Sequence, residues 1–141
     1  MGSRRIRPRG SRLAWLAAVV VTQACSDSLG PEDFEGTWAA EGVRLTLAPT
    51  HAFFETSCWH GELSIPLDVE GEGFESLGTI VSQGGAGMSE TRFATFAGRR
   101  TGTGLHLEVR PASLGLGPYD LTLDAQVEIP GCPQPASAPP P

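Results

Sequence analysis

The sequence contains no lysine, and all ten of its basic residues are arginine. No acidic residue precedes Asp27, whereas five of the arginines fall within the first twelve residues. When the first 24 residues are set aside, the remaining 117 carry 5 arginines against 16 Asp and Glu, which leaves a formal charge of −11. Because such an acidic surface repels phosphate groups, the composition argues against binding to nucleic acids or to an anionic membrane surface.

The chain is short and poor in helix-forming sequence. Its 141 residues include 18 Gly and 12 Pro, and they leave room for one modest domain. A pair of Rossmann units or a (β/α)₈ barrel needs more residues and more helix than this. Most large enzyme folds are therefore excluded.

Long hydrophobic runs are missing as well. The apolar stretch at residues 13–21 would rise about 13.5 Å as a helix, against a hydrocarbon core of about 30 Å. It follows a basic segment, residues 1–12, and precedes Ala24 and Cys25, which is the arrangement of a secretory signal peptide. We therefore predict that residues 1–24 are a signal peptide rather than a permanent membrane anchor.

Residues 21–25, Val-Thr-Gln-Ala-Cys, resemble the lipobox of bacterial lipoproteins. The resemblance implies that the thiol of Cys25 is diacylated and that Cys25 becomes the new N-terminus, followed by a tether over residues 25–33. Because Ser26 follows the cysteine, it also implies the periplasmic side of the outer membrane in a two-membrane bacterium. The alternative is an ordinary signal peptide cut nearby, which would give a secreted protein with an unmodified Cys25.

Cysteine is scarce, and its three positions limit the pairing. Acylation of Cys25 leaves only Cys58 and Cys132, and envelope proteins mature in an oxidising compartment. We therefore predict a disulfide between Cys58 and Cys132 that ties the second strand to the end of the last. A loop of about 75 residues closed in this way gives about 4.5 kcal/mol of stabilisation on the chain-entropy formula.

No segment from residue 34 onward keeps a helical period, but several alternate between apolar and polar residues. Residues 43–47, 105–109 and 121–129 show this alternation most clearly, and each predicts a strand with one wet face. Weaker strands, separated by turns, are predicted for residues 51–58, 61–67, 76–82 and 91–98.

Seven or eight short strands in about 100 residues are typical of an all-β antiparallel sandwich or a small lipocalin-like barrel. We favour the barrel because closure removes exposed strand edges. The interior of such a barrel is either filled by side chains or holds one small ligand, and both alternatives stay open. The large side chains available to fill it are Phe34, Trp38, Phe53, Phe54, Trp59, Phe74, Phe93, Phe96 and Tyr119.

The predicted domain spans residues 34–132, and the proline-rich residues 133–141 are predicted to be an extended, disordered tail. Several short sequences occur in a fixed order along the domain: Gly36-Thr-Trp38, Cys58-Trp-His-Gly61, Ile65-Pro-Leu-Asp68 and a closing Cys132. Together they resemble a family of uncharacterised secreted proteins and lipoproteins of bacteria. The resemblance implies a small β-rich domain with a Cys58–Cys132 link, and it implies no activity.

Catalytic and metal-binding motifs are also lacking. His51, His60 and His106 lie far apart, with no His or Cys pair at ligand spacing. No Gly-x-Ser-x-Gly sequence occurs, and the glycine-rich residues 84–87 lack the lysine and helix of a phosphate loop. We therefore expect neither enzymatic activity nor a metal or cofactor, and a turn at residues 84–87.

Trp59 and His60 are the predicted binding candidates, because they follow Cys58 at an expected strand end. We expect a monomeric, lipid-anchored envelope protein whose non-enzymatic β domain binds a small ligand or an envelope component, at the mouth or interior of the barrel if a site exists. The alternative is a protein–protein module, such as an inhibitor of envelope hydrolases, that uses exposed loop residues such as Trp59, or residues 82–91. An enlarged apolar cavity would favour the first function, and a flat, aromatic surface patch with a filled interior would favour the second.

Overall fold

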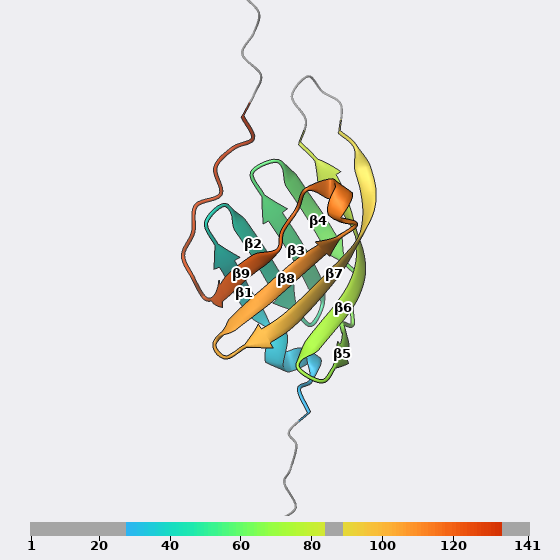
Figure 1. The fold of residues 1–141 in the computed structure, drawn as a ribbon, viewed down its shortest axis with the longest axis vertical. Helices are drawn as coiled ribbons and strands as arrows, with labels where there is room; N and C mark the ends of the chain where they lie inside the picture. Colours follow the sequence, from blue (N-terminus) through green and yellow to red (C-terminus); the bar gives the residue numbers. More distant parts are fainter. Residues whose placement is uncertain (1–27, 84–88, 134–141) are drawn as a thin grey trace, which may run out of the picture.

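The computed structural model describes residues 28–83 and 89–133. They form a closed antiparallel barrel of eight strands (Figure 1), which confirms the predicted all-β barrel. The predicted signal peptide, Cys25, the turn at residues 84–87 and residues 134–141 of the tail lie outside the described residues. The strands of the barrel are β1 (Gly36–Ala40), β2 (Val43–Ala48), β3 (His51–Thr56), β4 (Trp59–Leu63), β6 (Gly73–Ser82), β7 (Thr91–Thr101), β8 (Gly104–Arg110) and β9 (Tyr119–Leu123).

Two pairings between strands that do not follow one another in the chain close the barrel. β4 pairs with β6, with Gly61 opposite Ile80, and β9 pairs with β1, with Trp38 opposite Leu123. A short strand, β5 (Asp68–Glu70), pairs only with β6 and so extends the sheet outside the ring. β1 and β5 were not predicted from the sequence.

The alternation of β2 and β8 is confirmed residue by residue. Val43, Leu45 and Leu47 of β2 are buried, and the arginine and threonine between them are half-buried on the outer face. Leu105, Leu107 and Val109 of β8 show the same pattern. These side chains point into the barrel, so burial of apolar surface on one face of each strand drives the closure.

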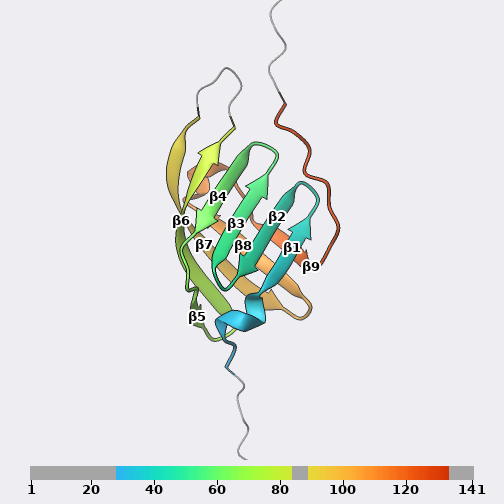
Figure 2. The same cartoon turned by 180° about the vertical axis from the view of Figure 1, so that it is seen from behind.

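One end of the barrel is closed by the chain that enters it (Figure 2). The short 3₁₀ helix η1 (Pro31–Phe34) delivers the fully buried Phe34, whose ring packs edge-on against Phe74 at 5.2 Å. The indole nitrogen of Trp38 donates a 2.7 Å hydrogen bond to the carbonyl of Phe34. The last residues of the predicted tether thus form a helical turn whose final residue belongs to the core.

Gly98 is required by this packing. A Cβ atom at Gly98 would clash with the ring of Phe74, which packs over the bare backbone of β7. A large aromatic ring and the neighbouring strand therefore approach more closely than any other residue at position 98 would allow.

The prediction of a strand over residues 121–129 was wrong in its second half. β9 ends at Leu123, and Asp124 takes a left-handed conformation with φ 56° while its amide donates to the carbonyl of Thr37. The chain then turns back over the outside of the barrel as an extended segment, residues 125–132, which we call the strap (Figure 1).

The strap keeps the alternation that suggested a strand. Ala125, Val127 and Ile129 are half-buried, whereas the residues between them are exposed. A guanidinium nitrogen of Arg44 donates to the carbonyl of Val127 at 2.8 Å. Ala39, on the outward side of β1 next to the inward Trp38, is only 1% exposed. The alternation of half-buried and exposed residues over 125–129 therefore reflects an extended chain that lies on the barrel wall and forms no hydrogen-bonded pairing with a strand.

The predicted disulfide is present, between Cys58 and Cys132 with Cα atoms 4.6 Å apart. Its place differs from the prediction: Cys58 lies in the turn between β3 and β4, and Cys132 lies at the end of the strap rather than of a strand. The chain must leave the sheet at Asp124 for the strap to cross the outer wall and reach this turn.

Candidate binding surface

The interior of the barrel is filled. Phe34, Trp38, Leu45, Phe96 and Leu107 each expose 0% of their surface, so no water-sized void touches these side chains. The pairs Phe34–Phe74 and Phe54–Phe96 bring aromatic rings within 5.2 and 5.4 Å of each other across the core. Of the two alternatives for the interior, the structure therefore supports packing by side chains rather than a ligand cavity.

The outer wall formed by β3, β4, β6 and β7 carries large apolar side chains in water. Phe93 is 85% exposed, Leu77 68% and Phe53 45%. Strand register places Phe53, Glu62, Thr79 and Phe93 in one row across the four strands, and Leu77 lies two residues before Thr79 on β6. We call these five residues the wall patch.

An open depression of about 510 Å³ lies within the wall patch. Leu77, Phe93 and Glu62 contribute to its lining, together with Gly78, which adds no side chain of its own. A smaller pocket of about 190 Å³ lies at the end of the barrel where η1 enters, between Pro31, Leu47 and Leu67. Both hollows lie outside the filled interior.

Glu62 is the charged group of the wall patch. It is exposed and makes no ion pair with any residue in the described part of the chain. Nearby arginines are already engaged, and the pairs are Arg44 with Glu55 at 3.3 Å, Arg92 with Glu90 at 2.7 Å and Arg110 with Glu75 at 2.6 Å. The patch therefore combines exposed apolar groups with one carboxylate whose charge is not balanced.

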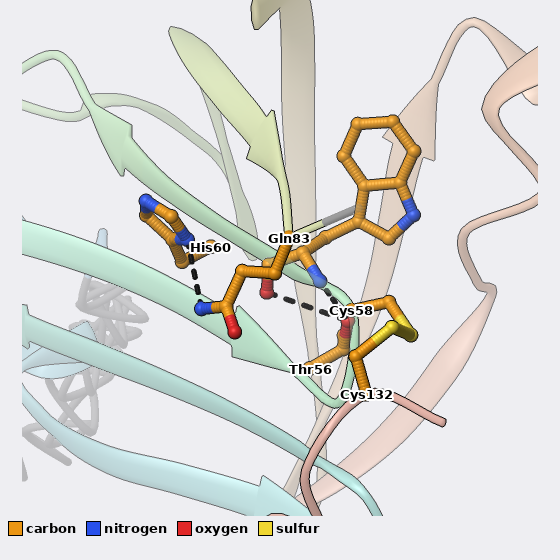
Figure 3. The surroundings of a disulfide bond; sticks show 6 residues. Thr56, Cys58, His60, Gln83 and Cys132 are labelled. Carbon is orange, nitrogen blue, oxygen red and sulfur yellow. Dashed lines mark hydrogen bonds between the residues drawn. A yellow bond between two sulfur atoms is a disulfide. The ribbon is translucent and has the colours of Figure 1, made fainter. Parts of the chain in front are cut away.

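The structure places the predicted candidates Trp59 and His60 at the start of β4, beside the disulfide. Trp59 is half-buried and packs against the core, so it is not the exposed loop residue that we expected. His60 is exposed, and its Nδ1 lies 3.1 Å from the side-chain nitrogen of Gln83 (Figure 3). The backbone N–H of Gln83 donates a hydrogen bond to the carbonyl of Cys58. Gln83 thus links the end of β6 to the disulfide turn, and the contacts of both candidates are structural.

None of Glu55, Glu62 and Asp68 makes a hydrogen bond with His60. Glu55 is its cross-strand partner on β3 but binds Arg44, and Glu62 lies two residues further along β4. Asp68 belongs to β5, which pairs only with β6. Register alone therefore brings two carboxylates onto the same wall as His60 without forming a site around it.

The other two histidines lie on separate parts of the surface. The ring of His51 packs at a tilt against the ring of Phe53, a wall-patch residue, with the ring centres 5.5 Å apart. His106 binds Asp120 at 2.7 Å on the outer face of β8 and β9. Within residues 28–83 and 89–133, no three His, Cys, Asp or Glu side chains are arranged to hold a metal ion.

Tyr119 carries an acid–base group whose pKa is shifted by its surroundings. Burial at the start of β9 raises the pKa of its hydroxyl, and a hydrogen bond with the backbone of Gly117 opposes the shift. No helix in the described part of the chain is both long and apolar enough to cross a membrane.

Comparison with known protein families, characterised proteins and solved structures finds no significant match for this chain. The resemblance to bacterial lipoprotein domains therefore stays a prediction.

Sequence reasoning missed the wall patch, although one signal for it was present. Phe53 and Phe54 are adjacent, and neighbouring residues of a strand point to opposite faces, so one of the two rings had to lie outside. The positions of Leu77 and Phe93 relative to Phe53 depend on the register between four strands, which the sequence does not reveal.

Proposed function

We propose that this chain is a lipid-anchored envelope protein whose β-barrel is a non-enzymatic protein-binding module. The observation that carries the proposal is the wall patch on a barrel with a filled interior. An interior occupied by Phe34, Trp38 and Phe96 leaves no room for a small molecule. Phe93, Leu77 and Phe53, in contrast, leave apolar surface in water that a protein partner would bury.

The geometry of the barrel suits presentation on a tether. The described chain enters at one end, through η1, and the ends of β6 and β7 that flank Gln83 and Glu90 lie at the opposite end (Figure 1). If Cys25 is acylated, the short segment before η1 would hold that end near the membrane. Phe93, two residues after the start of β7, would then lie near the end of the barrel that is far from the membrane.

The rigidity of the wall also supports a binding role. β3, β4 and β6 are paired on both sides over the row that contains Glu62 and Thr79, β7 pairs with β6 at Phe93, and the disulfide ties the turn between β3 and β4. A patch held on rigid strands loses little conformational entropy when a partner covers it.

Photo-crosslinking in the native envelope tests the proposed function. A benzophenone side chain at position 93 should give a discrete protein adduct, whereas the same group at the exposed position 103, in the turn between β7 and β8, should give none. Equal adducts at both positions, or none at position 93, would contradict a protein-binding role for the wall patch.

A further inference from the structure

This inference rests on the proposal that the wall patch is the binding site. At that site, the charge of Glu62 restricts which partners can bind. The carboxylate stands in the row between Phe53 and Phe93, with the uncharged Thr79 as its cross-strand neighbour on β6. A partner that covered this row with apolar groups alone would strip water from an unpaired charge, which is unfavourable. Binding is therefore favoured when the partner supplies a positive charge at Glu62.

The charge of the whole domain points the same way. The described residues carry five arginines against fifteen Asp and Glu. Arg44, Arg92 and Arg110 lie on β2, β7 and β8, and each is held in an ion pair of its own. A cationic partner would thus be attracted to the barrel as a whole, whereas a second copy of this acidic chain would be repelled.

The distance between Phe53 and Phe93 along the row determines the length of partner segment that can cover both rings. Phe53 and Phe93 stand three strand spacings apart, or about 14 Å, which an extended segment of about five residues spans. Glu62 lies one spacing from Phe53 and two from Phe93. A basic residue between apolar neighbours therefore matches the order of groups along the row.

We propose that the wall patch binds a segment of a partner protein in which a lysine or arginine is flanked by apolar side chains. The basic group pairs with Glu62, and the apolar groups cover Phe53 and the depression between Leu77 and Phe93. The basic group gives selectivity, and burial of Phe93 and Leu77 gives most of the affinity.

Labelled peptides serve as the probe. The mature chain in a nonionic detergent is titrated, by fluorescence anisotropy, into a ten-residue peptide with a central lysine flanked by phenylalanines, and into the same peptide with norleucine in place of the lysine. At a salt concentration of about 50 mM, where screening is weak, we expect a preference of about threefold to fivefold for the lysine peptide. Detergent alone is the blank for each peptide.

Three variants locate the effect. Glu62→Gln should bring the ratio of the two affinities close to one while retaining binding of the norleucine peptide. Glu70→Gln removes the same charge from an exposed position on β5, away from the row, and should keep the preference. Phe93→Ser should weaken the binding of both peptides by about tenfold, since it removes a large exposed ring.

A preference that persists in Glu62→Gln, or its absence in the wild type, overturns the inference about the partner. So does failure of both peptides to bind at about 1 mM. A dimer that sedimentation velocity detects and Phe93→Ser dissociates also overturns it, because the patch would then bind an acidic copy of the chain. Crosslinks at position 93 without a lysine preference would leave the protein-binding role standing and reject only the basic partner.

Discussion

Loss of the Cys58–Cys132 disulfide should destabilise the domain without changing its fold. The bond joins residues 74 apart in the sequence, so its removal frees a long loop in the unfolded chain. The chain-entropy formula gives about 4.5 kcal/mol, and measured values are typically about 2–4 kcal/mol. In the folded state only the strap is released, because every strand of the barrel lies before Asp124.

Contacts that hold the strap after the bond is lost are few. They are the hydrogen bond from Arg44 to Val127 and the half-burial of Ala125, Val127 and Ile129. We therefore expect the strap to detach and to expose Ala39, which faster amide exchange along β1 would reveal. The rest of the barrel should keep its circular dichroism spectrum.

Thermal unfolding of Cys58→Ser, Cys132→Ser and the double variant measures the effect. At about 4 °C or more per kcal/mol for a domain of this size, each should lower Tm by at least about 8 °C. The double variant should be no less stable than the worse single one, because all three lack the same bond. A fall of less than about 3 °C in all three, or additive losses in the double variant, would refute the reasoning.

Three further outcomes are expected. Intact mass of the mature wild-type protein should show acylation at Cys25, Cys25→Ser should be released or misprocessed, and an unmodified N-terminus elsewhere would reject the lipoprotein hypothesis. Gly98→Val should lower the free energy of unfolding by about 1–3 kcal/mol through its clash with Phe74, whereas Gly131→Ala, which meets no atom, should leave it unchanged in a denaturant titration. The single tyrosine, Tyr119, should titrate above its ordinary pKa of 10.0 in the folded protein and near that value in urea, as followed by absorbance. Because the folded pKa is raised, its contribution to stability is present below pH 10 and is lost as the pH rises through the folded pKa; identical titration in both states would contradict the burial.

The alternation of apolar and polar residues along the chain was sufficient to predict where most strands lie. Residues 43–47 and 105–109 alternate because one face of each strand packs in the barrel, and both became strands as predicted. Residues 121–129 alternate for two different reasons: the first part pairs in β9, and the second lies flat on the outer wall as the strap. Alternation reports an extended chain with one face covered, and it does not report whether its backbone is paired.

The binding surface could be predicted only in part. The adjacent Phe53 and Phe54 require one exposed ring, but Phe93 and Leu77 join Phe53 only through the registers of β3, β4, β6 and β7. Trp59 and His60 were predicted as binding candidates because they follow a cysteine at an expected strand end. That same position makes them structural, since the strand end is where the disulfide and Gln83 fasten the turn.

Native mass spectrometry of the protein extracted from its own envelope tests most directly whether the outer wall, rather than the interior, is the binding site. We expect the mass of the acylated chain without any small molecule, together with a population bound to a second protein, and we expect Phe93→Ser to lose that population. A small molecule that stays bound to both the wild type and Phe93→Ser would contradict the filled interior and the proposed role of the wall patch.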